Sequence, residues 1–114
     1  MRSLVFHLAR QNDPSQVEMT MFCTLAKKRQ DWSTFEQLPH AVGLVTDDVE
    51  TVQALRHYQQ LMNQFDDIHR FLFIDDLPDL VLRAPDAVSV LVNLAAQGRG
   101  SHIHLVIGTQ RLGA

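Results

Sequence analysis

The sequence predicts an α/β fold in three layers, with a mainly parallel sheet between flanking helices. Two observations favour this class. Short apolar runs of strand length alternate with longer segments whose apolar residues recur at helical spacing. One run, Phe71 to Ile74, has four consecutive apolar residues, which is typical of a strand buried on both faces of a parallel sheet. Alternating strands and helices also indicate right-handed crossovers.

The first elements are a short helix and a strand. Apolar residues between positions 4 and 9 have helical spacing, and the helix should end near Gln11 because Asn12-Asp13-Pro14 is a turn sequence. The run from Val17 to Cys23 alternates in a way that predicts a strand.

A basic and an aromatic segment follow. Lys27-Lys28-Arg29 interrupts the apolar pattern, and we interpret it as a solvated loop, with a phosphate or DNA contact as the alternative. Trp32, Phe35 and Leu38 are spaced by three, so we expect a short helical turn that packs on the core. The alternative interpretation is an aromatic platform for base stacking.

Residues 41–46 predict a short buried strand, followed by a long helix. Asp47 with Glu50 three residues later resembles a capping box, which marks the helix start. The helix should pack through an apolar stripe made of Val49, Val52, Leu55, Tyr58, Met62 and Phe65.

After the run at Phe71–Ile74, Pro78 and Pro85 bracket a connection. Pro85 suits the first turn of a further helix. Its expected apolar residues are Val88, Leu91, Val92, Leu94 and Ala95, and Gly98 and Gly100 should end it before a last strand over residues 103–109.

Composition and charge bound the function. The chain has 114 residues, 46% of them hydrophobic and 20% charged, as expected of one small globular domain. The net charge of −3 gives no support for nucleic-acid binding. One cysteine, Cys23, cannot form an internal disulfide, and no apolar run approaches the roughly 20 residues of a membrane span. We therefore expect a cytoplasmic chain without membrane contact.

Two carboxylates directly follow the apolar run at Phe71–Ile74. A buried parallel strand delivers Asp75 and Asp76 to its carboxyl end, which is the edge of an α/β sheet where ligands usually bind. An acid at this place can hold the Mg²⁺ of a bound nucleotide, as in the Walker B pattern. A solvated acidic turn is the alternative interpretation.

A second candidate site consists of two histidines near the last strand. His102 and His104 are two residues apart and would share one face of a strand, a spacing that can serve a metal. Zinc needs further ligands, and the sequence has no cysteine pair or His-Glu-x-x-His helix to supply them. Metal binding by this pair is therefore the less favoured interpretation.

Several spaced segments share the motif order of one protein family. They are Leu38-Pro39-His40, Val45-Thr46-Asp47, Ile74-Asp75-Asp76-Leu77-Pro78-Asp79-Leu80, Gly98-Arg99 and Ile103-His104-Leu105 leading to Thr109-Gln110-Arg111. Over nearly its whole length the chain resembles the motor domain of the FtsK/SpoIIIE DNA translocases, which are RecA-like P-loop ATPases. Two features depart from the family. The phosphate loop Gly-x-x-x-x-Gly-Lys-Ser/Thr (Walker A) is absent, and Cys23-Thr24 does not reproduce the acid of an Asp-Pro-Lys element.

The resemblance implies a single partial ATPase domain over residues 1–114. Residues 1–4 resemble the helix that follows the Walker A loop, and the chain ends after the Thr-Gln-Arg sensor strand, before the family's last core strand. The fold would then be an incomplete RecA-like P-loop NTPase core. We expect such a part to bind ATP weakly and to be inactive in isolation.

The resemblance also implies a chemistry, which is ATP hydrolysis coupled to movement along double-stranded DNA, as in chromosome segregation. Asp75 would hold Mg²⁺ through water, and Asp76 stands where the family has the glutamate that polarises the attacking water. Thr109 and Gln110 resemble the polar sensor near the γ-phosphate. Arg99 and Arg111 are candidates for charge stabilisation within or between subunits.

The same comparison implies partners. A full motor would bind double-stranded DNA as a homo-oligomeric ring, and this chain would form a dimer or an edge-paired assembly, because its last strand would lie at a sheet edge. Two other functions remain open. One is a catalytically dead binding or assembly module, and the other is an unrelated Mg²⁺-binding domain of the flavodoxin or receiver kind.

Overall fold

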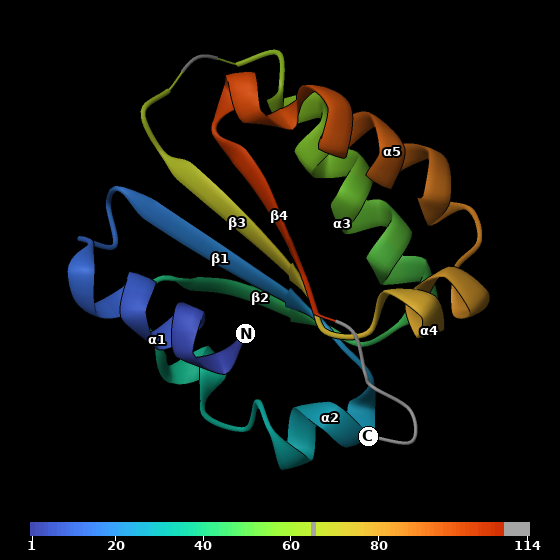
Figure 1. Ribbon diagram of the computed structural model, residues 1–114, viewed down its shortest axis with the longest axis horizontal. Coiled ribbons are helices and arrows are strands. Elements are labelled where there is room, and N and C mark those ends of the chain that lie inside the picture. The colour runs from blue at the N-terminus through green and yellow to red at the C-terminus, as the bar shows by residue number, and fades with distance from the viewer. Residues whose placement is uncertain (65, 109–114) are drawn as a thin grey trace.

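The computed structural model describes residues 1–64 and 66–108. These residues form a four-stranded sheet in the order β2-β1-β3-β4, and every neighbouring pair is parallel (Figure 1). The strands are β1 (Val17–Phe22), β2 (Ala41–Val45), β3 (His69–Ile74) and β4 (Ile103–Ile107). The predicted α/β class is confirmed.

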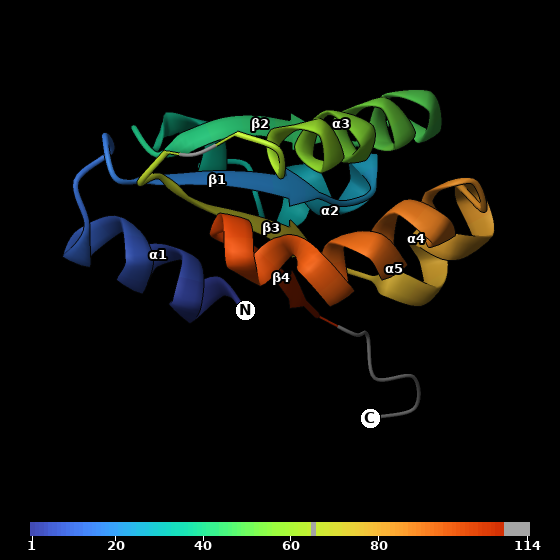
Figure 2. The same ribbon diagram turned by 90° about the horizontal axis from the view of Figure 1, so that it is seen from above.

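Helices cover both faces of the sheet. One face carries α1 (Arg2–Gln11), α2 (Leu25–Gln30) and the short 3₁₀ helix η1 (Phe35–Gln37), and the other carries α3 (Asp48–Leu61), α4 (Leu77–Arg83) and α5 (Ala87–Gln97). Figure 2 shows α4 adjoining α5, and Figure 1 shows α1 on the other side of the strands from both. Across the described residues, no helix combines the length and apolar character needed to cross a bilayer.

Each face has its own apolar core. The core under α1 includes Val5, Met19, Met21, Trp32, Phe35 and Phe73, and the core under α3, α4 and α5 includes Leu55, Tyr58, Leu72, Ile74, Leu80, Leu91 and Leu94. Strands β1 and β3 contribute to both cores because they are the inner strands. The expected packing of Trp32 and Phe35 on the core is confirmed, since they are 4% and 1% exposed.

The two outer strands differ from the sequence-based expectation in burial. Residues 41–45 do form a strand, but β2 lies at a sheet edge and its Val42 is 54% exposed. The prediction of a buried strand there was wrong, because an edge strand is covered on fewer sides. Strand β4 is the opposite edge, as expected, and its exposed residue is Ile107.

The basic segment belongs to a helix, so its interpretation as a solvated loop was wrong. The Thr24 side chain caps α2 by accepting a hydrogen bond from the Lys27 backbone N–H at 3.1 Å. Lys27 pairs with Asp31 at 3.1 Å, and Lys28 pairs with Glu36 at 3.4 Å. The capping threonine and the i,i+4 ion pair explain why this polar segment is helical.

The start of α3 matches the capping prediction, but its stripe is narrower than expected. Asp47 accepts a hydrogen bond from the Glu50 backbone N–H at 3.0 Å. Leu55 and Tyr58 are buried, whereas Val49 is 64% exposed. Phe65 lies outside the described residues.

The connection predicted between Pro78 and Pro85 is helix α4. Its N-cap is Asp76, and Pro78 lies in its first turn, where its missing N–H removes no helical hydrogen bond. Helix α5 then begins at Ala87 and buries Ala87, Val90, Leu91 and Leu94. Val88, Val92 and Ala95 are exposed, so the expected stripe was rotated relative to the true one.

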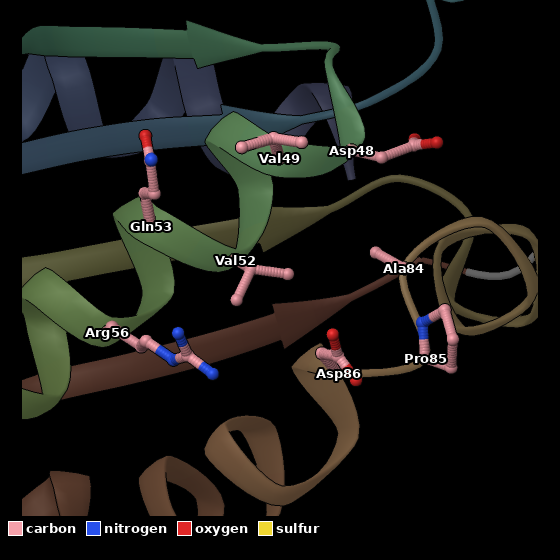
Figure 3. Close-up of a pocket in the computed structure, with 8 residues that line it drawn as sticks. All are labelled: Asp48, Val49, Val52, Gln53, Arg56, Ala84, Pro85 and Asp86. Atoms are coloured by element: carbon pink, nitrogen blue, oxygen red, sulfur yellow. The ribbon is translucent and has the colours of Figure 1, made fainter.

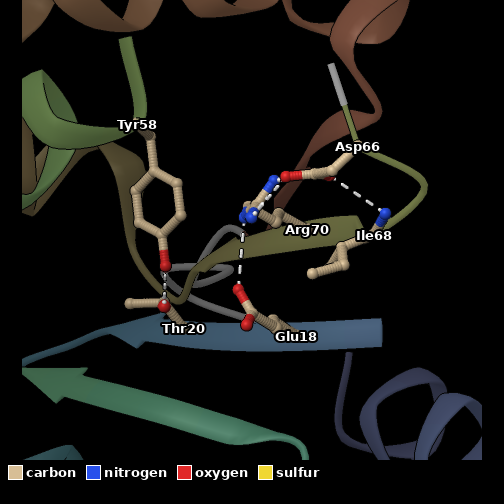
Figure 4. Close-up of polar contacts among 6 residues, drawn as sticks. All are labelled: Glu18, Thr20, Tyr58, Asp66, Ile68 and Arg70. Atoms are coloured by element: carbon tan, nitrogen blue, oxygen red, sulfur yellow. Dashed lines mark hydrogen bonds and ion pairs between the residues drawn. The ribbon is translucent and has the colours of Figure 1, made fainter. Parts of the chain in front are cut away.

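A polar network centred on the buried Arg70 joins β1 to β3 beneath α3 (Figure 4). Arg70 is 8% exposed, and its guanidinium donates to Glu18 at 3.2 Å and to both carboxylate oxygens of Asp66 at 3.1 and 3.0 Å. Thr20 and Tyr58 share a hydrogen bond in the same layer. The network fixes how β1, β3 and α3 lie relative to one another.

Candidate functional site

The acidic pair lies where the parallel strands end. The Asp75 backbone N–H donates to the Phe22 carbonyl at 3.0 Å, and the Gly108 N–H donates to the Ile74 carbonyl at 2.8 Å. These bonds place Asp75 between the ends of β1 and β4. It therefore occupies the carboxyl edge of the sheet, as the sequence predicted.

The side chain of Asp75 is half-buried, and its Oδ2 atom is buried without a hydrogen-bond partner among the described residues. Burial raises the pKa of the Asp75 carboxyl; Asp31 and Asp76 also raise it, whereas Lys27 lowers it. A half-buried carboxylate is stabilised by a nearby cation or by a hydrogen-bond donor. Oxygen donors are what Mg²⁺ prefers, so Asp75 fits the predicted metal-holding role.

Asp76 has a structural task at the same edge. Its Oδ1 accepts a hydrogen bond from the Asp79 backbone N–H at 3.2 Å, which caps α4. The cap turns the carboxylate toward the helix start. Any role for Asp76 in orienting water would have to coexist with this bond.

The amino end of α1 reaches this edge. A Cβ atom built on Gly108 would lie 3.2 Å from the Asp75 carbonyl oxygen and 3.2 Å from the Met1 Cε atom. Glycine therefore allows β4, Asp75 and the start of α1 to approach one another closely. Helix N-termini attract anions, so the positive end of the α1 dipole favours negative charge at this edge of the sheet.

Three predicted residues, Thr109, Gln110 and Arg111, lie outside the described residues. They directly follow Gly108 in the sequence. Arg99 lies in the 3₁₀ turn η2 (Gly98–Ser101), which leads into the amino end of β4. Arg99 and Asp75 therefore lie at opposite edges of the sheet and are not close to each other within one chain.

Sequence reasoning missed the charged neighbours of Asp75. Lys27 and Asp31 of the α2 region are close enough to shift its pKa in opposite directions. Burial, with a further contribution from Asp75, raises the pKa of the Cys23 thiol to about 12, so this thiol is inert. The available signal was that Lys27 and Asp31 lie in the segment that follows β1, the strand next to β3 in the sheet.

A second basic residue also joins this edge. Arg83 of α4 donates to Asp79 at 2.7 Å and pairs with Asp48 at the start of α3. A cleft of about 290 Å³ lies beside it, lined by Thr24, Leu25, Thr46, Asp47, Asp48 and Arg83. The ion pairs tie α4 to α3 near the ends of β1 and β2.

The two histidines near β4 both contact a third histidine, His69. His102 precedes the strand in a left-handed conformation (φ 61°), and its ring stacks on His69 at 4.2 Å between centroids. His104 Nε2 lies 3.0 Å from His69 Nδ1, within hydrogen-bond distance. No cluster of three metal-ligating side chains occurs in the part of the chain that the structure describes.

Another cleft lies between α3 and the turn that joins α4 to α5 (Figure 3). Its volume is about 300 Å³, and its apolar wall is formed by Val49, Val52, Ala84 and Pro85. Polar side chains line the rest, namely Asp48, Gln53, Arg56 and Asp86. No local sequence pattern indicates this cleft, because its residues come from two separate helical segments.

The arrangement of strands and helices matches two solved structures from Thermomonospora curvata. One is EccC (ATPases 2 and 3) in complex with a signal sequence peptide, with a TM-score of 0.75, 18% identity, and coverage of 95% of this chain and 22% of that chain. The fold is that of an ATPase domain. The other is the cytoplasmic domain of the type VII secretion ATPase EccC, with a TM-score of 0.67, 20% identity, and coverage of 97% and 16%.

This chain thus spans about a fifth of the length of each of these ATPase structures. No family model and no curated protein matches the sequence. At identities of 18% and 20% the likeness establishes the fold alone. The activity has to be argued from the site.

Proposed function

We propose that this chain is part of an ATP-driven motor of the FtsK/SpoIIIE-like clade, in which it supplies the acidic edge of the nucleotide site. One observation carries the proposal. In an ATPase-domain fold, Asp75 directly follows an inner strand and places a half-buried carboxylate at the carboxyl edge of the sheet. The same position carries the metal-holding acid in P-loop ATPases.

The proposed roles follow from position. Asp75 holds Mg²⁺ through water, and Asp76 orients the attacking water while it caps α4. Thr109, Gln110 and Arg111 are proposed to act near the γ-phosphate, because this Thr-Gln-Arg segment resembles the polar sensor of the family. Bound Mg²⁺ would neutralise phosphate charge and thereby relieve the repulsion between these acids and the nucleotide.

The phosphates would need a further group. The sequence has no Gly-x-x-x-x-Gly-Lys-Ser/Thr loop, whose backbone N–H groups and lysine provide most of the grip on phosphates. In P-loop ATPases that loop leads into a helix whose start faces the nucleotide. Helix α1 begins beside Gly108 and Asp75, so we assign it this place and treat residues 1–114 as a partial domain.

The polymer that the motor moves is proposed from the sequence motifs. The segments around Asp75 and Ile103-His104-Leu105 resemble translocases of double-stranded DNA, acting as a homo-oligomeric ring in the cytoplasm. DNA contacts would come from the assembled ring, since the net charge of this chain is −3.

The test is a chain extended at its N-terminus by a strand and a Gly-x-x-x-x-Gly-Lys-Thr loop. The extended chain should hydrolyse Mg-ATP, and double-stranded DNA should stimulate the rate. A folded extended chain that binds Mg-ATP without hydrolysing it would refute the motor proposal. Hydrolysis that DNA leaves unchanged would refute the DNA assignment alone.

A second candidate function is a binding or assembly module. The cleft between α3 and the α4–α5 turn favours it, because apolar walls with polar side chains at the rim suit a peptide side chain. The EccC structure with 18% identity holds a signal sequence peptide. Fluorescence anisotropy with apolar peptides should then show binding that Val49→Asp abolishes, while the exposed Val42→Asp on β2 leaves it intact.

A further inference from the structure

The indole of Trp32 is fixed in place but has an unused donor. The ring is 4% exposed and packs edge-on against Phe35, with centroids 6.1 Å apart. The Trp32 backbone N–H donates to the Lys27 carbonyl at 3.2 Å. Its Nε1 atom is buried and has no hydrogen-bond partner among the described residues. An indole N–H can only donate, so it needs an acceptor nearby.

Asp75 has an acceptor atom that is likewise unused. Its Oδ2 atom is buried and also without a partner among the described residues. Buried polar groups are nearly always hydrogen-bonded, so a buried donor and a buried acceptor that are both unpaired call for a common explanation.

Two observations place these groups together. Cys23 packs in the same apolar cluster as Trp32, and the Asp75 backbone N–H donates at 3.0 Å to the carbonyl of Phe22, the residue before Cys23. The Trp32 side chain is close enough to Asp75 to lower the pKa of that carboxyl as a hydrogen-bond donor, against the stronger effect of burial. The competing donor, Lys27, is already bonded to Asp31 at 3.1 Å.

We propose that Trp32 is a positioning residue, whose indole N–H donates to Oδ2 of Asp75 and thereby turns the other carboxylate oxygen toward the carboxyl edge of the sheet. The bond itself does not depend on the proposed ATPase function. The functional consequence of the bond does rest on the proposed ATPase function, because the oriented oxygen would face a Mg²⁺-bound nucleotide at that edge. Metal-holding carboxylates are commonly oriented by such outer hydrogen bonds.

The chain is suited to a direct test because Trp32 is its sole tryptophan. A ¹H–¹⁵N spectrum therefore contains one indole Nε1–H peak. Asp75→Asn keeps the shape of the side chain but makes the acceptor neutral and weaker, so the indole proton should move upfield by more than its linewidth. Asp86→Asn is the control, since it neutralises an exposed carboxylate that makes no side-chain cap bond to α5 and should leave the peak in place.

The reciprocal variant is Trp32→Phe, which keeps an aromatic ring and removes the donor. The carboxyl ¹³C signal of Asp75 should shift in this variant, while that of Asp76 should not. Folding of each variant is checked by the dispersion of the remaining backbone peaks. An indole peak that ignores Asp75→Asn, or that moves equally with Asp86→Asn, would overturn the proposal.

This experiment is independent of nucleotide. An indole peak that responds to Asp75→Asn would stand even if the extended chain failed to hydrolyse ATP. Conversely, an active extended chain with an unresponsive indole would refute only the role of Trp32.

Discussion

His69 Nδ1 and His104 Nε2 lie 3.0 Å apart, and the two rings are nearly parallel, with 10° between their planes. One ring nitrogen must donate and the other accept. The bond therefore requires that at least one of the two imidazoles be neutral. It links the first residue of β3 to β4 at the amino edge of the sheet.

The contact between His69 and His104 predicts that the free energy of unfolding falls at mildly acidic pH. Burial lowers the pKa of His104, and the neighbouring His69, His102 and Arg99 lower it further. A histidine whose folded pKa lies below its unfolded value binds fewer protons when folded. Its contribution is complete above the unfolded pKa of about 6.5 and is lost as pH falls below that value. Urea unfolding should therefore give a lower free energy at pH 5 than at pH 7.

The control for this pH effect is His104→Phe. Phenylalanine does not titrate and can stack on Phe71, whose ring lies 4.7 Å from that of His104. The difference in unfolding free energy between pH 7 and pH 5 should shrink in the variant. An unchanged difference would assign the pH dependence to other groups.

Arg70 should be the costliest ion-pair residue to replace. Arg70→Met removes three hydrogen bonds to Glu18 and Asp66 and should lower the unfolding free energy by about 2 kcal/mol, because the guanidinium is buried while its two carboxylate partners stay partly solvated. Lys28→Ala breaks an exposed pair with Glu36 and should cost less than about 1 kcal/mol. Urea denaturation of both variants measures the contrast, and similar losses would contradict it.

Much of the fold could be predicted from local sequence. The Asp47 cap, the turn after Gln11 and the buried strand at Phe71–Ile74 each depend on residues close in sequence. The exposure of Val42 could not be predicted, because it depends on which strand becomes an edge. Helix α4 was missed because two prolines look like breakers, although Pro78 lies where a helix tolerates it.

The site was only partly predictable for the same reason. Asp75 and Asp76 were found because a strand and its end are contiguous in sequence. Trp32 was assigned to packing, and that is correct for its ring. The acceptor proposed for its Nε1 atom is Asp75, which lies more than forty positions away in the sequence. No local sequence pattern predicts that the two residues are close in space.

The acidic pair should respond unequally to substitution in the extended, loop-bearing chain. Asp75→Asn should abolish ATP hydrolysis, since an amide gives Mg²⁺ no negative charge. Asp76→Glu should preserve or raise the rate, because the longer side chain matches the reach of the usual glutamate. The same change weakens the cap of α4 and should cost about 1 kcal/mol of stability. Loss of hydrolysis by a folded Asp76→Glu variant would end the catalytic assignment of Asp76.

The chain on its own should bind Mg-ATP weakly. Without a phosphate loop, the carboxylates at the carboxyl edge repel the triphosphate unless Mg²⁺ intervenes, and the N-terminus of α1 alone offers few N–H donors. Calorimetric titration should show no micromolar affinity. A micromolar dissociation constant would mean that other residues of this chain grip the phosphates.

The last prediction is that the chain self-associates through β4. The His102 carbonyl and the Gly108 N–H both bond to β3, so even-numbered residues of β4 point their backbone groups inward. Those of Ile103, Leu105 and Ile107 therefore point to the edge. The described strand contains neither proline nor lysine, the residues that usually blunt such edges. We expect a dimer paired along this strand or formed by exchange of an element.

Ile107→Pro tests this edge with little cost to the fold. Ile107 is 47% exposed, and proline there removes an outward N–H while the ladder to β3 keeps its bonds. Sedimentation should show that the wild-type chain is larger than its 13.0 kDa monomer and that the variant is monomeric. Val42→Lys on the opposite edge is the control and should not alter the assembly. A wild-type chain that stays monomeric at high concentration would show that the open side of β4 does not recruit a second copy.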